Sequence, residues 1–300
     1  MKLTARLAAL AAVATLVVAC GPPSGGASQP PSQAASVAPV SEAPTVELIA
    51  PPTSLIAAGK LTDCVDIEYP PMEFFPEGES DADKAVGFDV DAAKAVADRL
   101  GLAITIRNTA FDALIPDLQA GRCDIVWSAL YINETRLKVA DAVPYMATGQ
   151  VVMVKVGNEA GISGPDDLCG KTVSVQSGGL VEERINAASK ACTDGGNKAI
   201  NIQGYKLVAD ELQQIVLGRV DAVWETDSAI SDWMLKHPGE YEVAYALPRD
   251  DTYGVYYAKG KADIGTAFAA ALVALNTDGT LDAIALQYQI DAATLDAIGK

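Results

Sequence analysis

The sequence predicts an α/β protein built from parallel sheets covered by helices. Short apolar segments typical of strands alternate with longer segments in which apolar residues recur at helical spacing, from about residue 61 to the end. Half of the 300 residues are hydrophobic, which is ample for one large core or two smaller ones. Periodicity alone leaves open a single sheet or two lobes.

Local signals support each predicted element in turn. In the segment 89–100, Asp89 and Asp91 lie in the first turn, where a helix favours negative charge. In the segment 112–120, Pro116 is early enough to be tolerated, and Gly121 ends the helix. The predicted strands are 61–67, 102–107, 123–129, 151–156, 172–176, 220–224 and 253–257, and the predicted helices are 89–100, 112–120, 181–190, 207–217, 262–275 and 280–289.

The N-terminus has the features of a secretion signal. Lys2 and Arg6 supply positive charge, and 13 residues that are apolar apart from Thr15 follow them. This run is too short to span a bilayer as a helix. It ends in Val-Val-Ala before Cys20 and Gly21, which resembles the lipobox of bacterial lipoproteins. The resemblance implies a signal peptide over 1–19 and lipidation of Cys20; an ordinary signal peptide is the alternative.

Residues 20–53 are predicted to be a flexible, lipid-anchored tether. Eight of the 16 prolines lie between residues 21 and 52, where there is no aromatic residue. Such a composition cannot bury enough apolar surface to order itself. The globular body is therefore expected to begin at residue 54.

Charge and histidine content exclude several classes of function. The formal net charge of −17 argues against nucleic acid as a partner. His237, in a turn-like stretch, is the single histidine, so metal sites built from several histidines are excluded. We expect no metal, no cofactor and no catalytic residue.

Four cysteines follow Cys20 in the sequence, and an exported chain meets oxidising conditions. Cys64 and Cys123 could be bonded if their strands are parallel neighbours. Cys169 and Cys192 bracket a strand and helix, and a bond there would stabilise the fold by about 3 kcal/mol. Four buried free thiols are the alternative.

Seven motifs of the body occur in the order and spacing of one family. The most distinctive is the Gly-aromatic-Asp-Val-Asp pattern that begins at Gly87. Together the motifs resemble the bacterial extracellular solute-binding proteins of family 3, the amino-acid receptors of ABC importers. The matching segments are 66–74, 87–92, 111–116, 121–124, 128–136, 218–222 and 253–255.

The resemblance implies a two-lobed periplasmic-binding-protein fold of type II, with the ligand between the lobes. Each lobe would be a mainly parallel sheet with flanking helices. Lobe 1 would comprise 54–147 and 245–300, and lobe 2 would comprise 148–244. Two hinge segments, near 147–150 and 244–248, would join them.

In lobe 1, Arg136 aligns with the arginine that binds the α-carboxylate of the ligand. Its guanidinium can bind a carboxylate through two parallel hydrogen bonds. Tyr69 and Phe111 align with an apolar sandwich around the ligand. Asp66 aligns with a position that meets a polar or cationic side chain in some members. The ligand loop, which carries Arg136, also contains Ala129 and Tyr131.

In lobe 2, Gly178, Gly179 and Leu180 align with a loop that opens a helix, whose backbone N–H groups would add to the carboxylate site. Many members have two threonines where this chain has Gly179 and Leu180. The carboxylate for the ligand ammonium is predicted to be Asp227, with Glu225 as the alternative.

The implied function is an extracytoplasmic, lipid-anchored receptor that binds a polar or cationic amino acid and delivers it to an ABC transporter permease. We expect a monomer that is not an enzyme. A dehydratase on the same fold, of the cyclohexadienyl or arogenate type, is one alternative, since cleft carboxylates can serve as acid and base. A tethered ligand sensor is another.

Overall fold

The computed structural model describes residues 48–300. The predicted signal peptide 1–19, the lipidated Cys20 and most of the predicted tether lie outside these residues. The end of the predicted tether lies against the body. The Ile49 amide donates to the Arg99 carbonyl oxygen at 2.9 Å, and the Thr53 and Ser54 amides donate to the Asp263 carboxylate at 2.8 and 2.9 Å. These contacts attach residues 49–54 to the body.

The first sheet has the strand order β2-β1-β3-β10-β4. Strand β1 pairs in parallel with β2 and β3, and β10 is antiparallel to both β3 and β4. Four of the five strands therefore run in one direction. The strands are β1 (Lys60–Val65), β2 (Ala103–Asn108), β3 (Ile125–Val126), β4 (Ala140–Thr148) and β10 (Asp251–Ala258).

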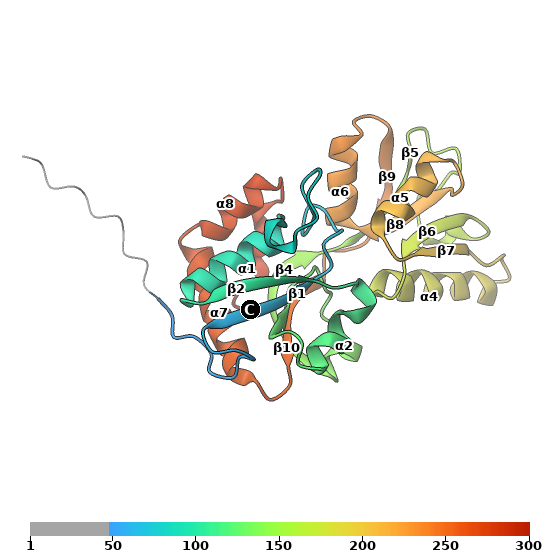
Figure 1. Cartoon of the computed structure of the whole chain (residues 1–300). Helices are drawn as coiled ribbons and strands as arrows, with labels where there is room; N and C mark the ends of the chain where they lie inside the picture. The colour runs from blue at the N-terminus through green and yellow to red at the C-terminus, as the bar shows by residue number, and fades with distance from the viewer. Residues whose placement is uncertain (1–47) are drawn as a thin grey trace, which may run out of the picture. The chain divides into compact units, whose positions relative to one another are not determined.

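Helices cover both faces of the first sheet (Figure 1). Adjacent residues of β3 point to opposite faces, as the strand period requires. Ile125 packs in the core that contains Phe88 and Phe268, whereas Val126 packs with Leu114. The helices of this part are α1 (Phe88–Arg99), α2 (Leu114–Gln119), α3 (Glu134–Leu137), α7 (Ala262–Thr277) and α8 (Thr280–Gln287), with short 3-10 turns at Ala82–Lys84, Phe111–Ala113 and Ala292–Ala297.

The second sheet has the order β7-β6-β8-β5-β9 and the same mixture of pairings. Strands β7, β6 and β8 are parallel neighbours, and β5 is antiparallel to β8 and β9. The elements are β5 (Gln150–Lys155), β6 (Thr172–Gln176), β7 (Asn201–Tyr205), β8 (Ala222–Thr226), β9 (Tyr241–Ala246), α4 (Leu180–Asp194), α5 (Val208–Val216) and α6 (Asp227–Lys236), with a 3-10 turn at Pro165–Leu168.

Two kinds of difference separate the predicted elements from the observed ones. Strands β4, β7 and β9 and helix α6 were not predicted. The strand predicted at 123–129 is reduced to two residues, because the Trp127 amide donates to the Asp63 carboxylate at 2.9 Å rather than to a neighbouring strand. Two residues later the backbone turns, since Ala129 has φ of 43°.

Both predicted disulfides form. Cys64 is bonded to Cys123 with a Cα–Cα distance of 5.7 Å, and Cys169 to Cys192 with 5.5 Å. The parallel pairing of β1 with β3 provides the proximity that the first bond needs.

Among residues 48–300, no single helix has the length and apolar character to cross a membrane, although α7 and α8, bent by 77°, meet both criteria as a pair.

Candidate functional site

A narrow cavity lies where loops of the two sheets meet, and the space left inside it is about 20 Å³. Most of its lining follows the carboxyl ends of strands β1, β3, β6 and β8, the usual place for ligand sites in such sheets. The lining residues are Asp66, Tyr69, Glu73, Phe111, Ser128, Ala129, Tyr131, Arg136, Gln176, Gly179, Leu180, Val181, Glu225 and Thr226.

Arg136 is the single cation in this lining. The Asn133 side chain caps α3 by accepting from the Arg136 amide at 2.8 Å, which fixes the backbone of the arginine. The guanidinium donates to the Tyr131 carbonyl oxygen at 2.9 Å and stands 5.7 Å from the centre of the Phe111 ring. Burial lowers the pKa of Arg136, but an arginine remains charged in proteins.

The aromatic walls of the cavity come from the first sheet and reach the second. The Tyr69 hydroxyl donates to Glu225 Oε1 at 3.2 Å and forms a hydrogen bond with the Thr226 hydroxyl. Phe111 packs against the opening of α4, where a Cβ on Gly179 would lie 3.5 Å from its ring. That distance is ordinary van der Waals contact, so the approach of α4 to the ring does not itself require glycine.

Gly178 does not line this cavity. Its amide donates to the Glu182 carboxylate at 2.8 Å, so that N–H group is engaged within its own segment. Gly179 and Leu180, the other two residues predicted from this loop, do line the cavity.

Carboxyl groups outnumber the single guanidinium in the cavity. Burial raises the pKa of Asp66 to about 7, with a further contribution from Asp112. Burial also raises the pKa of Glu225 to about 7, opposed by hydrogen bonds from the Thr226 amide and Tyr69. Among the described residues Glu225 Oε2 has no hydrogen-bond partner. An incoming cation would favour the charged form of both groups.

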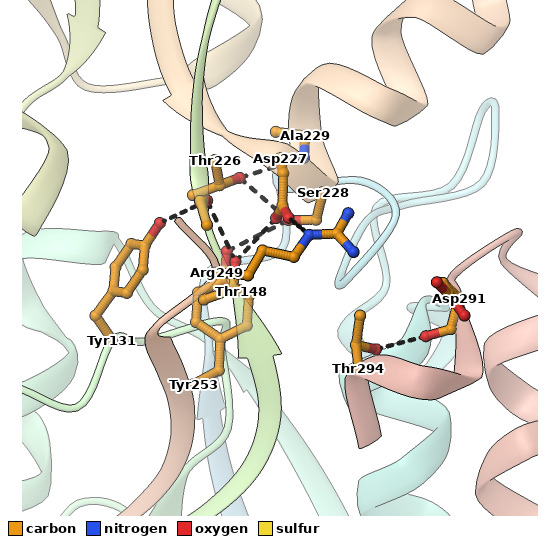
Figure 2. A network of polar contacts seen from close by, with 11 residues as sticks. Tyr131, Thr148, Thr226, Asp227, Ser228, Ala229, Arg249, Tyr253, Asp291 and Thr294 are labelled. Atoms are coloured by element: carbon orange, nitrogen blue, oxygen red, sulfur yellow. Dashed lines mark hydrogen bonds and ion pairs between the residues drawn. The ribbon is translucent and has the colours of Figure 1, made fainter. Parts of the chain in front are cut away.

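Asp227 lies outside the lining of this cavity. Strand β8 ends at Thr226, whose side chain caps α6 by accepting from the Ala229 amide at 3.2 Å, and the turn into the helix directs Asp227 away from the cavity. Its carboxylate accepts from the Thr148 hydroxyl at 3.0 Å and from Arg249 Nε at 2.6 Å (Figure 2). The alternative, Glu225, is the acid of this segment that lines the cavity.

Glu68 links the two sheets at the edge of the cavity. Its carboxylate accepts from the Val208 amide, at the start of α5, at 3.0 Å and from Gln176 Nε2 at 3.1 Å. Burial, and then the charge of Asp66, raise the pKa of Glu68 to about 8. A bidentate pair between Arg184 and Asp251, at 2.5 and 2.7 Å, also joins the two halves.

Sequence reasoning missed several lining residues. Glu73 and Ser128 lie inside matched motifs but received no role. Gln176 ends a predicted strand, so the rule that ligands bind at strand ends could have found it. Within residues 48–300, no three His, Cys, Asp or Glu side chains are grouped to hold a metal ion.

Comparison with known proteins identifies the family. Residues 61–290 match the bacterial extracellular solute-binding proteins, family 3, and the chain belongs to that family. The L-cystine-binding protein TcyJ of Escherichia coli K12 is 30% identical over 222 residues, which cover 73% of this chain and 79% of the relative.

Solved structures agree with this assignment. An ancestral arginine-binding protein bound to arginine superposes with a TM-score of 0.69 and 31% identity, over 77% of this chain and 98% of that one. The ancestral amino-acid-binding protein AncCDT-1, described as a precursor of cyclohexadienyl dehydratase, has a TM-score of 0.66 and 28% identity, over 77% and 95%. The predicted family and the two-lobed α/β fold of type II are confirmed.

Proposed function

We propose that this protein is an extracytoplasmic, lipid-anchored receptor that binds an amino acid between two closing lobes and delivers it to an ABC transporter permease. The observation that carries the proposal is the placement of a guanidinium and an incompletely paired carboxyl group, Arg136 and Glu225, in one enclosed cavity. A zwitterionic ligand presents the complementary pair of charges. We expect the receptor to act as a monomer.

The proposed binding mode assigns each end of the ligand to one lobe. Arg136 binds the α-carboxylate, and Glu225 binds the α-ammonium in place of Asp227, which is already paired with Arg249. Tyr69 and Phe111 enclose the aliphatic part, and the Gly179 and Leu180 amides face the carboxylate end. Charges in an enclosed site interact much more strongly than in water, which favours this arrangement.

A polar or cationic side chain on the ligand is favoured by a further carboxyl group of the lining, that of Asp66. Asp66 is 8% exposed and lines the cavity away from any lysine or arginine partner among the described ion pairs. A second positive charge on the ligand would compensate it. The names of two of the similar binding proteins above, for cystine and for arginine, are compatible with a polar ligand.

The proposed lobes are 54–147 with 245–300, and 148–244. The first sheet takes its strands from 60–148 and 251–258, and the second from 150–246. The chain passes between them at Gly149 and again between Ala246 and Asp251, where the Leu247 amide donates to the Gln150 carbonyl oxygen at 2.8 Å. In this structure Tyr69 already contacts Thr226, and Glu68 already contacts Val208, across the two proposed lobes.

A thermal-shift screen of the purified protein against the natural amino acids and L-cystine tests the binding function. A ligand that binds the native state raises the unfolding midpoint, and a tighter ligand raises it further. Titration calorimetry of Arg136→Ala should then show at least about a hundredfold weaker binding, as for loss of a charge-assisted bidentate contact. Arg122→Ala, at an exposed arginine paired with Asp117, is the matched control. No shift with any amino acid would refute the proposal.

The proposed anchor has its own test. Cys20→Ser should move the protein from the membrane fraction to the soluble fraction and remove the mass of the lipid. An unchanged distribution would contradict lipidation at this residue.

An enzymatic function has one specific point in its favour. The carboxyl groups of Asp66 and Glu225 have pKa values near 7, which suits general acid and base catalysis. Incubation with cyclohexadienyl substrates, followed by chromatography for a dehydrated product, distinguishes an enzyme from a receptor.

A further inference from the structure

Two carboxyl groups, Asp89 and Glu73, are buried beside the cavity, and Glu73 also lines it. Asp89, in the first turn of α1, is fully buried, and Glu73 is 1% exposed. Among the described residues, Asp89 Oδ1 and Glu73 Oε2 have no hydrogen-bond partner. Neither has been given a role in the binding function above.

Asp89 holds the backbone of a cavity residue. Its Oδ2 accepts from the Ala129 amide and from the Tyr145 hydroxyl, both at 2.7 Å. Ala129 has φ of 43°, in the left-handed region that residues other than glycine seldom adopt. Such a conformation persists where surrounding contacts impose it, and the Asp89 carboxylate is one of those contacts.

Glu73 joins the two loops that line the cavity. The Ser128 hydroxyl donates to Glu73 Oε1 at 2.7 Å and accepts from the Asp66 amide at 3.0 Å. The segment just after β1, which carries Asp66, is thereby tied to the segment that carries Ser128 and Ala129.

We propose that Asp89 and Glu73 are positioning residues for the ligand site, in which one shared proton lets Glu73 donate to the Asp89 carboxylate while the pair holds Asp66, Ser128 and Ala129 in the binding geometry. The pair touches the ligand loop from behind and acts through it. The expected effect of the pair on ligand affinity depends on the proposed amino-acid binding, whereas its expected effect on hydrogen exchange does not.

Charge balance supports a single shared proton. Two ionised carboxylates that neighbour each other in a buried site would repel each other, so one of them keeps its proton. Burial and the neighbouring Asp89 raise the pKa of Glu73 well above its usual range. The ionisable groups that face the pair are Asp63 from β1, Asp66 just after β1 and Tyr145 from β4, and none of them supplies a positive charge.

Hydrogen exchange followed by mass spectrometry tests the structural part without any ligand. In Asp89→Ala, peptides that cover 127–131 should exchange at least about tenfold faster, because the Ala129 amide loses its side-chain acceptor. Asp98→Ala makes the same chemical change at an exposed position of the same helix and should leave exchange of these peptides as in the wild type. Equal exchange in the two variants would overturn the proposal.

Two variants of Glu73 distinguish a role as hydrogen-bond donor from a role in packing alone. Glu73→Gln keeps an N–H donor for Asp89 and an oxygen acceptor for Ser128, whereas Glu73→Leu fills similar space with neither. We expect the affinity for L-arginine to fall at least about tenfold further in Glu73→Leu than in Glu73→Gln. Hydrogen exchange at 127–131 should likewise be faster in Glu73→Leu than in Glu73→Gln. Equal behaviour of the two variants would contradict a hydrogen-bonding role.

The pH dependence provides a readout that a purely structural residue would not give. As the pH rises, the wild type should lose exchange protection at 127–131 when the shared proton leaves. Glu73→Gln cannot lose that proton and should keep its protection over the same range. If L-arginine does not bind, the affinity result bears on the proposed function alone, and the exchange profiles still decide the role of the pair.

Discussion

Proton competition at Asp66 gives the sharpest test of how the cavity recognises a cation. The carboxyl group lines the cavity, and burial raises its pKa to about 7. A cationic ligand binds the ionised form, so protons compete with it as the pH falls. The ionised fraction drops from about nine-tenths at about pH 8 to about one-tenth at about pH 6, so the affinity should fall about tenfold.

The sign of the effect follows from the direction of the pKa shift. Ligand binding favours ionisation, so it lowers the pKa of Asp66 and releases a proton. At about pH 7 the release attributable to Asp66 should be about half a proton per ligand. Glu225, whose pKa is also raised, would increase both the loss of affinity at low pH and the number of protons released.

Titration calorimetry at several pH values, in buffers of different ionisation enthalpy, measures both the affinity and the proton release. Asp66→Asn should remove the part of the pH dependence that this carboxyl group causes. Asp282→Asn, at an exposed position on α8, is the matched control. An affinity that stays constant or increases between about pH 8 and about pH 6 would refute the reasoning.

Three further changes have predictable outcomes. Arg136→Lys should weaken amino-acid binding about thirtyfold in calorimetry, because an ammonium cannot form two parallel bonds; equal binding would exclude a bidentate contact. Gly87→Ala should lower the free energy of unfolding by about 3 kcal/mol or more, because its Cβ would lie 2.2 Å from a backbone oxygen at φ of 126°. Gly78→Ala, with positive φ but open space around it, should cost about 1 kcal/mol in the same denaturant titration. Replacing Cys169 and Cys192 by serine should cost about 3 kcal/mol, and an unchanged unfolding midpoint would show that this bond contributes nothing.

The strands that the sequence did not reveal all lie at sheet edges. Strand β4 is the edge of the first sheet, and β7 and β9 are the edges of the second. An edge strand has one neighbour and a weak apolar signal. In β4 the signal is further obscured by Pro144, which cannot donate to a ladder and is tolerated because the strand is at an edge. The inner strands, buried on both faces, were predicted because their apolar runs are nearly continuous.

The motif that begins at Gly87 shows what a sequence can and cannot establish. The sequence identified the pattern and its family, but the pattern alone gave no reason for the glycine or for Asp89. In the structure, a Cβ at Gly87 would collide with the Met72 backbone, and Asp89 accepts from the Ala129 amide forty residues later in the chain. Such long-range contacts have no signal in local periodicity.

The choice between Glu225 and Asp227 depended on where strand β8 ends and helix α6 begins. Residues two apart in a strand share a face, so strand alternation alone does not separate these two acids. The helix begins directly after the cap at Thr226, and that cap depends on a hydrogen bond that residue types do not reveal. Charge balance supports the same choice independently. Asp227 already has the Arg249 guanidinium at 2.6 Å, whereas Glu225 is 1% exposed and keeps one oxygen unpaired among the described residues. Glu225 also lies near the buried Glu211, both of whose oxygens are unpaired among those residues. A buried carboxyl group in that position gains most from a cation, so the acid that lacks a partner is the one that a ligand ammonium can stabilise.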